Sequence, residues 1–190
     1  MKIIDTYLNE IFLFKSDLHV DKRGFFSEYF VSKSFEKEVG KKIHFCQENI
    51  TYSKKGVLRG LHYQLSPHSQ TKLVSVLKGS VLDIIVDIRK GSPTFGQHVS
   101  QELSEDNKFQ LFVPRGFAHG YITLSEDSIF QYKVDNYYYP ESEASIAADD
   151  PSLEIDWIIS KEYWIQSDKD QKHPMLEDAV LFDYNDDLYA

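Results

Sequence analysis

The sequence has one cysteine and no excess of positive charge. A single thiol, Cys46, excludes an internal disulfide and fits a reducing cytoplasm. It stands between Phe45 and Gln47, so we interpret it as a small core residue rather than a nucleophile. The formal net charge of −9 argues against a general nucleic-acid binder, because such proteins usually present a basic surface. A local basic site for an anionic small molecule is compatible with this charge.

Long hydrophobic runs are also missing. The N-terminal segment contains only short apolar stretches, interrupted by Asp5, Asn9 and Glu10, which is not the pattern of a signal peptide. No window approaches the roughly 20 apolar residues of a membrane helix. We therefore expect a soluble, cytoplasmic protein that makes no contact with a membrane.

What is present is a chain able to build a core. Its 190 residues are 42% hydrophobic and 14% aromatic, which suits one domain over residues 1–190. Short runs rich in Val, Ile, Phe, Tyr and Thr alternate with turn signals at spacings typical of an all-β barrel or sandwich. The expected strands lie near 11–15, 25–30, 44–51, 57–64, 71–78, 80–88, 97–103, 109–113, 120–124 and 128–135.

Helical patterns are confined to the flanks of this β-region. Residues 32–39 predict a short helix that ends at Gly40. A second short helix is expected within 160–172. We thus predict a β-barrel core over about 10–140 and a helical C-terminal tail over about 155–190.

Asp83 interrupts an apolar strand, VLDIIVDIR. An unpaired buried carboxylate costs several kcal/mol, so a buried Asp83 requires a cationic or donor partner. The alternative is that Asp83 faces solvent on a one-sided strand. The sequence alone favours neither.

The segment VLRGLHYQ carries Arg59 and His62 in a strand-like run. Strict alternation places these two side chains on opposite faces. Gly60 between them is a position where a bulge or bend would let both reach one cavity. Taken alone, an exposed Arg and a satisfied core His are the simpler interpretation.

Other polar residues shift that balance. His119 follows a tight turn in FQLFVPRGFAHGY, Tyr132 lies in IFQYKVDNYYY, and Lys72 begins a strand in QTKLVSVLKG. Each has an ordinary structural explanation, but together they would line a β-cavity with a base, a phenolic acid and cations for an anion. The chain has no serine-centred elbow, no phosphate loop and no closely spaced His, Cys and carboxylate set for zinc.

Long motifs in order resemble one family. DKRGFFSEYF, QENITYSKKGVLRGLHYQ, KLVSVLKGSVLDIIVDIRKGSPTFG, LFVPRGFAHGY and YKVDNYYYPESEASI are similar to the dTDP-4-dehydrorhamnose 3,5-epimerases, from about residue 21 through the tail. The resemblance implies a jelly-roll, cupin-like β-barrel and a homodimer, with no metal and no organic cofactor. It also implies an isomerase that inverts carbons 3 and 5 of dTDP-4-keto-6-deoxy-D-glucose on the way to dTDP-L-rhamnose.

The resemblance also assigns catalytic roles. His62 matches the base that removes a proton next to the ketone, and Asp170 matches the carboxylate behind it. Lys72 matches the residue that stabilises negative charge on the ketone oxygen, and Tyr132 matches the acid on the opposite face of the ring. A neutral imidazole, with an ordinary pKa near 6.5, suits proton abstraction at neutral pH.

Further positions match the family's ligand contacts. Asp83 resembles the carboxylate that backs His119, and the early strand of a dimeric member serves the neighbouring subunit's site. Tyr138 matches the aromatic residue that stacks on thymine. The implied binding residues are Arg23, Phe26, Glu28, Gln47, Glu48, Asn49, Arg59, His119, Tyr138, Glu143 and Lys169.

One departure from the family concerns residues 146–149, IAAD. Many members carry a basic–aromatic pair after the Ile, where this chain has Ala147 and Ala148. This difference concerns the nucleotide or rim contacts and leaves the nucleotide preference open.

The sequence leaves three alternative functions open. A related epimerase would invert only carbon 3 or accept another nucleotide-linked 4-keto sugar. A metal-dependent cupin enzyme is suggested by PRGFAHG, but Tyr63 and Gln64 follow His62 where an HxH pair is required. A non-catalytic sugar-nucleotide binding module is disfavoured by His62, Lys72 and Tyr132 together. The sequence does not give the final deoxysugar product or any stable association with a downstream reductase.

Overall fold

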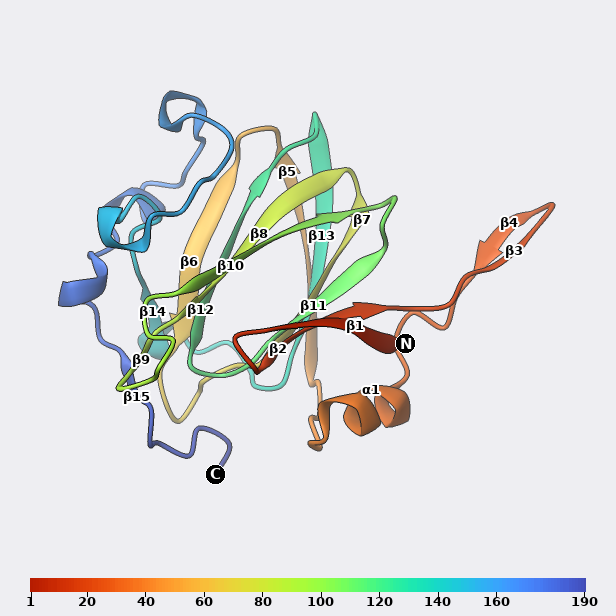
Figure 1. The fold of residues 1–190 in the computed structure, drawn as a ribbon. Helices are drawn as coiled ribbons and strands as arrows, with labels where there is room; N and C mark the ends of the chain where they lie inside the picture. Colours follow the sequence, from red (N-terminus) through yellow and green to blue (C-terminus); the bar gives the residue numbers. More distant parts are fainter.

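Two antiparallel β-sheets packed face to face form most of the computed structural model, which describes residues 1–190 (Figure 1). In spatial order the six-stranded sheet contains β1 (Lys2–Tyr7), β2 (Ile11–Lys15), β11 (Phe109–Val113), β7 (Lys72–Lys78), β13 (Asp127–Val134) and β5 (Gln47–Lys54). The five-stranded sheet contains β10 (His98–Ser104), β8 (Ser80–Asp87), β12 (Phe117–Thr123), β6 (Leu58–Gln64) and β14 (Glu143–Ser145). This architecture confirms the all-β, jelly-roll class predicted from the sequence.

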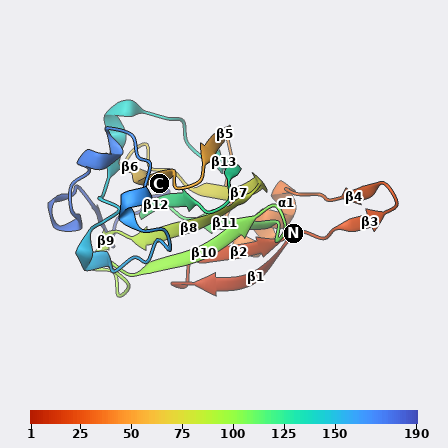
Figure 2. The same cartoon turned by 90° about the horizontal axis from the view of Figure 1, so that it is seen from above.

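Two small ribbons lie outside these sheets. β9 (Arg89–Lys90) pairs in parallel with β15 (Phe182–Asp183). β3 (His19–Asp21) and β4 (Gly24–Phe26) form a hairpin that projects away from the body of the molecule in two views (Figures 1 and 2). The predicted strand at 25–30 is therefore wrong in its extent, because only its first two residues lie in β4.

Several strand predictions agree closely with the structure. The expected segments 11–15 and 109–113 coincide with β2 and β11. β1, β3 and β14 were not predicted, and none of these three strands contains a buried residue. Without a buried face, a strand has less need of the Val-, Ile- and Phe-rich runs on which the prediction depends.

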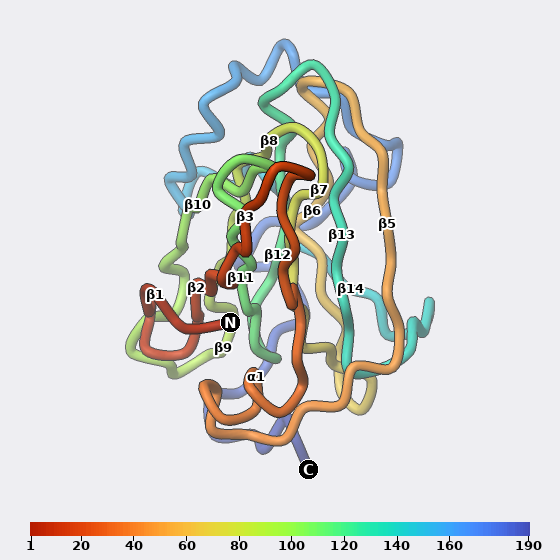
Figure 3. The backbone as a smooth tube through the Cα atoms, turned by 90° about the vertical axis from the view of Figure 1, so that its right-hand side faces the viewer, coloured from red at the N-terminus to blue at the C-terminus, as the bar shows by residue number.

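The gap between the sheets holds an apolar core over part of its length. Alternation along β8 points Val81 and Ile85 into this gap and Ile84 and Val86 to the opposite face. On the six-stranded sheet, β13 and β5 run side by side at one edge (Figure 3). The inward-facing positions that are not apolar form the site described below.

The outer face of the six-stranded sheet is covered by α1 (Ser32–Val39), as predicted. Phe35 is fully buried on this helix and packs against Phe14 and Phe112. The helix ends at Gly40, whose left-handed backbone (φ 73°) lets its N–H bond to the Glu36 carbonyl.

The C-terminal segment covers the outer face of the five-stranded sheet through residues such as Leu153 and Trp157 (Figure 1). The helix expected within 160–172 is not formed; only single 3-10 turns occur, at Lys161–Tyr163 and Asp170–Lys172. Between these turns the chain is extended, and Ile165 bridges to Val57 beside β6. None of the helices has the length and apolar character needed to span a membrane.

Candidate active site

A cavity of about 230 Å³ lies between the two sheets and collects six of the residues singled out in the sequence. These six are Arg59, His62, Lys72, His119, Tyr132 and Asp170. Three further residues, Thr51, Tyr121 and Phe130, complete the lining. The cavity therefore combines a candidate base, a candidate acid and several cations, as expected for the site.

A bulge in β6 aims Arg59 and His62 into the same cavity. Opposite them on β12, His119 pairs with His62 and Tyr121 pairs with Arg59, so β6 carries one residue more than β12 over this stretch. Gly60 lies in the bulge with φ 125°, and a Cβ there would meet the Gly120 Cα at 2.6 Å. The bulge that the sequence suggested is confirmed. It explains how Arg59 and His62, three positions apart, can both face the cavity.

His62 and Asp170 form a tight pair at one wall. The Nε2 atom of His62 lies 2.7 Å from Asp170 Oδ1. Burial alone would raise the pKa of Asp170, but the hydrogen bond and charge of His62 outweigh it and hold the pKa below its usual range. An ionised carboxylate only accepts, so in the neutral form of His62 the proton is on Nε2 and the lone pair on Nδ1.

The C-terminal segment brings Asp170 to this wall. The Leu58 N–H donates to the Ile165 carbonyl at 3.0 Å, which fixes the tail beside the start of β6. The Asp170 N–H then donates to Ser167 Oγ at 3.1 Å. The orientation of the carboxylate is thus set by backbone pairing as well as by His62.

Lys72 begins β7 on the opposite sheet. Burial lowers the pKa of its ammonium from 10.5 to about 8, although the charges of Asp83 and Glu143 oppose the shift. Its Nζ donates to the His62 carbonyl at 3.4 Å, across the gap. At neutral pH it is a desolvated cation aimed at the cavity, which is the property required to stabilise a developing oxyanion.

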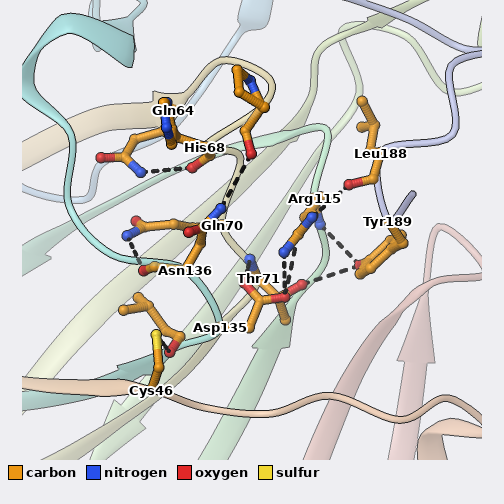
Figure 4. A network of polar contacts seen from close by, with 12 residues as sticks. Cys46, Gln64, His68, Gln70, Thr71, Arg115, Asp135, Asn136, Leu188 and Tyr189 are labelled. Carbon is orange, nitrogen blue, oxygen red and sulfur yellow. Dashed lines mark hydrogen bonds and ion pairs between the residues drawn. The ribbon is translucent and has the colours of Figure 1, made fainter.

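A polar network fixes the start of β7 (Figure 4). The Thr71 N–H donates to Asp135 Oδ1 at 2.6 Å, and Arg115 pairs with the same carboxylate at 3.1 Å. Tyr189 Oη lies 3.1 Å from Thr71 Oγ1, and Arg115 donates to the Leu188 carbonyl at 2.7 Å. The chain end is therefore bonded to the residue that precedes Lys72.

His119 and Asp83 form a second buried pair. The His119 Nε2 lies 2.8 Å from Asp83 Oδ2, and Asp83 is fully buried. Burial lowers the pKa of His119 in spite of Asp83, so this imidazole is neutral at pH 7. The question that the sequence left open is settled: Asp83 is inside, with a histidine partner.

Tyr132 enters the cavity from β13, on the sheet opposite His62. Burial raises the pKa of its phenol, with a contribution from Tyr121. The hydroxyl is therefore protonated at neutral pH and able to donate. A ligand between the sheets would have His62 on one side and Tyr132 on the other.

Three candidate binding residues gather beside the cavity without lining it. Glu143 Oε2 lies 2.6 Å from Lys169 Nζ and 2.5 Å from the Tyr138 hydroxyl. The hydrogen bond to Glu143 raises the pKa of Tyr138 to about 12. The ring of Tyr138 is mostly exposed, so its face is accessible to a planar ligand.

The remaining candidates are not among the residues that line the cavity of this chain. Gln47, Glu48 and Asn49 lie along β5, where Gln47 Nε2 donates to Asn49 Oδ1 at 2.9 Å and Glu48 pairs with Lys133. Arg23 and Phe26 lie on the projecting hairpin, and Glu28 follows it, exposed. Arg23 makes an ion pair with Asp21 at 2.6 Å instead of facing the cavity.

Ala147 and Ala148 do not line the cavity either. Both are buried, at 5% and 3% exposure, and the Ala148 carbonyl accepts a hydrogen bond from Trp157 Nε1 at 2.8 Å. The departure from the family motif thus lies in the packing under the C-terminal segment.

Four residues near the base were not singled out from the sequence. Thr51, Tyr121 and Phe130 line the cavity, and the alternation of Phe130 with Tyr132 was an available signal. His173 is the fourth: its Nε2 lies 3.4 Å from Asp170 Oδ1. His62, Asp170 and His173 form a set with metal-ligand spacing, which the sequence does not reveal because 108 positions separate His62 from Asp170.

Comparisons with known proteins agree with this geometry. A family model described as dTDP-4-dehydrorhamnose 3,5-epimerase matches residues 5–178. The dTDP-4-dehydrorhamnose 3,5-epimerase of Shigella flexneri is 46% identical over 182 residues, which are 96% of this chain and 99% of that protein.

Solved structures show the same similarity. The dTDP-6-deoxy-D-glucose-3,5-epimerase from Legionella pneumophila Philadelphia 1, in complex with dTDP-4-keto-L-rhamnose, matches with a TM-score of 0.93 and 46% identity, over 97% of this chain and 99% of that one. A 3'-monoepimerase from Streptomyces bikiniensis, in complex with dTDP-quinovose, matches with a TM-score of 0.85 and 30% identity, over 93% and 88%. The fold is therefore shared by proteins named for double and for single epimerisation.

Proposed function

Because the chain belongs to the dTDP-4-dehydrorhamnose 3,5-epimerase family, we propose that it converts dTDP-4-keto-6-deoxy-D-glucose to dTDP-4-keto-L-rhamnose within this cavity. It is an isomerase, and its product feeds dTDP-L-rhamnose biosynthesis. The observation that carries the proposal is the convergence of His62, Lys72 and Tyr132 from two sheets on one cavity.

His62 acts as the base in this proposal. Carbons 3 and 5 flank the carbon-4 ketone, so their protons are weakly acidic. Nδ1 of His62 takes the proton, and the electron pair of the broken C–H bond moves into the enolate. Asp170 stabilises the imidazolium that results and holds the productive tautomer, which its 2.7 Å contact with Nε2 supports.

Lys72 stabilises the enolate oxygen. Its ammonium is desolvated, so its attraction for a developing negative charge is stronger than it would be in water. Neutral His119, backed by Asp83, supplies a further polar contact to the sugar.

Tyr132 completes the inversion. Its phenol donates a proton to the same carbon from the face opposite His62, and the tyrosinate and imidazolium then return to their starting states by exchange with solvent. Repeating the cycle at the second carbon gives the doubly inverted sugar. The location of Tyr132 on the opposing sheet supports this role.

The nucleotide half binds at the cavity mouth. Arg59 is the cation suited to the pyrophosphate, since a guanidinium fork matches phosphate oxygens. Tyr138 stacks on thymine, with Glu143 and Lys169 beside it. Gln47, Glu48 and Asn49 on the edge strand β5 provide the remaining contacts.

A homodimer completes the site. The β3–β4 hairpin exposes apolar side chains, with Val20 at 75% and Phe26 at 65%, which is unfavourable on an isolated subunit. Packed on a second copy, this hairpin would deliver Arg23, Phe26 and Glu28 to the neighbouring cavity. The free thiol of Cys46 is compatible with the cytoplasmic location that we propose.

Incubation with dTDP-4-keto-6-deoxy-D-glucose in heavy water, followed by NMR, tests the proposal. We expect deuterium at carbons 3 and 5 and formation of dTDP-4-keto-L-rhamnose, whereas His62→Ala should exchange neither carbon. Deuterium at carbon 3 alone would identify a single epimerase. Binding without any exchange would identify a non-catalytic sugar-nucleotide module.

A further inference from the structure

The His62–Asp170 pair has a third residue beside it, His173, that the proposed reaction does not use. His173 lies three residues after Asp170, and its Nε2 is 3.4 Å from the same Oδ1 atom that binds His62. Its ring stands edge-on to that of His62, with 5.3 Å between centroids. One ligand atom from each of the three residues lies within 4.8 Å of the others.

His173 is buried and its ring is poorly hydrogen-bonded. Its side chain is 4% exposed, and neither ring nitrogen makes a hydrogen bond of good geometry; its nearest polar neighbours are Asp170 and the Ile146 backbone. Leaving a buried polar group unsatisfied costs about 1–3 kcal/mol, so such a group calls for an explanation. An imidazole nitrogen 3.4 Å from a carboxylate, beside a second imidazole, offers the donor types that a transition-metal ion prefers.

We propose that His62, Asp170 and His173 form an inhibitory binding site for a divalent transition-metal ion of the Zn²⁺ type. Bonds of about 2.0–2.2 Å in a tetrahedral site place neighbouring ligand atoms about 3.3–3.6 Å apart. The His173–Asp170 separation of 3.4 Å already fits, and the His62–Asp170 contact of 2.7 Å has to open slightly. Because His62 and Asp170 both line the cavity, the fourth position is open to water.

Metal binding at this site switches the base off. The ion occupies Nε2 of neutral His62, and the proton that Nε2 carried moves to Nδ1. Nδ1 then has no lone pair with which to take a substrate proton. The hydrogen bond to Asp170 is lost in the same step, so the pair no longer holds the productive tautomer.

Charge and donor chemistry set the selectivity. Asp170 supplies one negative charge, while the Lys72 ammonium on the other side of His62 opposes a cation. We therefore expect weaker binding than at a structural zinc site. Mg²⁺ and Ca²⁺ prefer oxygen ligands, so a site with two imidazoles should not retain them.

Metal binding can be measured without the reaction. Titration of metal-free protein with ZnCl₂ in a calorimeter should show one ion per chain, and Co²⁺ should give the visible absorption of a tetrahedral complex. His173→Asn should weaken zinc binding about tenfold or more, since it removes one of three protein ligands. His98→Asn, which changes a half-buried histidine of strand β10, is the matched control and should bind zinc as the native chain does.

Activity gives a second readout, which rests on the proposed function. Each variant's rate with zinc is compared with its own metal-free rate, so any effect of His173→Asn on folding or turnover cancels. Zinc should inhibit the native chain, EDTA should restore it, and His173→Asn should need about tenfold more zinc. His173→Gln provides a second variant if the first fails to fold.

Two results would overturn the inference. One is zinc binding by His173→Asn that is as tight as that of the native chain; the other is the absence of any zinc binding to the native chain. An inactive protein that binds zinc through His173 would contradict the proposed function and support the metal site. An active epimerase that binds no zinc would support the proposed function and contradict the metal site.

Discussion

Nε2 of His62 lies 2.7 Å from Oδ1 of Asp170, although 108 positions separate the two residues in the chain. With the carboxylate ionised, this contact leaves the proton on Nε2 and the lone pair on Nδ1. The contact thus decides which atom of His62 can act as a base.

Replacing Asp170 by Asn should lower kcat by about 10²- to 10⁴-fold with little change in KM. An amide can donate to Nε2 and stabilise the tautomer that has its proton on Nδ1, which is the wrong one for proton abstraction. Steady-state kinetics measure the effect, and Asp168→Asn, an exposed neighbour, is the control. A rate within threefold of the native value would show that Asp170 does not set the tautomer.

Tyr132→Phe should separate proton removal from inversion. His62 still removes and returns a proton on its own face, so deuterium should continue to enter the recovered substrate. Formation of the inverted product should fall by about 10²-fold, because the donor on the opposite face is lost. NMR in heavy water measures both, with exposed Tyr137→Phe as control. A change in affinity alone would make Tyr132 a positioning group.

The rate should fall in alkali through the titration of Lys72. Burial lowers the pKa of this ammonium to about 8, so the cation is present below that pH and lost above it. A profile of kcat/KM should therefore bend downward near pH 8. Lys72→Met should lower the rate at pH 7 by about 10²- to 10³-fold and remove this limb. A native profile that stays flat up to pH 10 would contradict the assignment.

Gly60→Ala should lower the free energy of unfolding by more than backbone strain alone, because the added Cβ would also clash with neighbouring backbone. Gly60 and Gly24 have nearly the same φ, 125° and 123°, but only at Gly60 would a Cβ meet backbone, at 2.6 Å. We expect Gly24→Ala to lower the free energy of unfolding by about 1 kcal/mol and Gly60→Ala by about 2 kcal/mol or more. Urea denaturation measures both. Equal losses would mean that β6 and β12 separate easily at the bulge.

The sequence predicted the long strands from runs rich in Val, Ile, Phe, Tyr and Thr between turn signals, and α1 from the Gly40 that ends it. It failed for β1 and β3, which bury no residue, and for the tail, where Ile165 is extended because it pairs with Val57. Pairing between distant segments leaves no periodic signal in either one.

Within the site, simple alternation put Arg59 and His62 on opposite faces, and only the bulge at Gly60 brings them together. Asp170 could be joined to His62 only by resemblance to a family, since no local pattern links them. The sequence did not point to His173, because only Asp170 lies near it in the chain. The third member of the group, His62, is close to it only in the folded structure.

The order in which the chain is synthesised has a consequence for when chemistry can begin. Every strand of both sheets has been translated by Ser145, yet the carboxylate that orients the imidazole arrives at residue 170. A polypeptide translated only as far as Ser145 therefore holds the strands of both sheets but lacks the carboxylate that orients its base. Turnover with an oriented base thereby requires translation past residue 170.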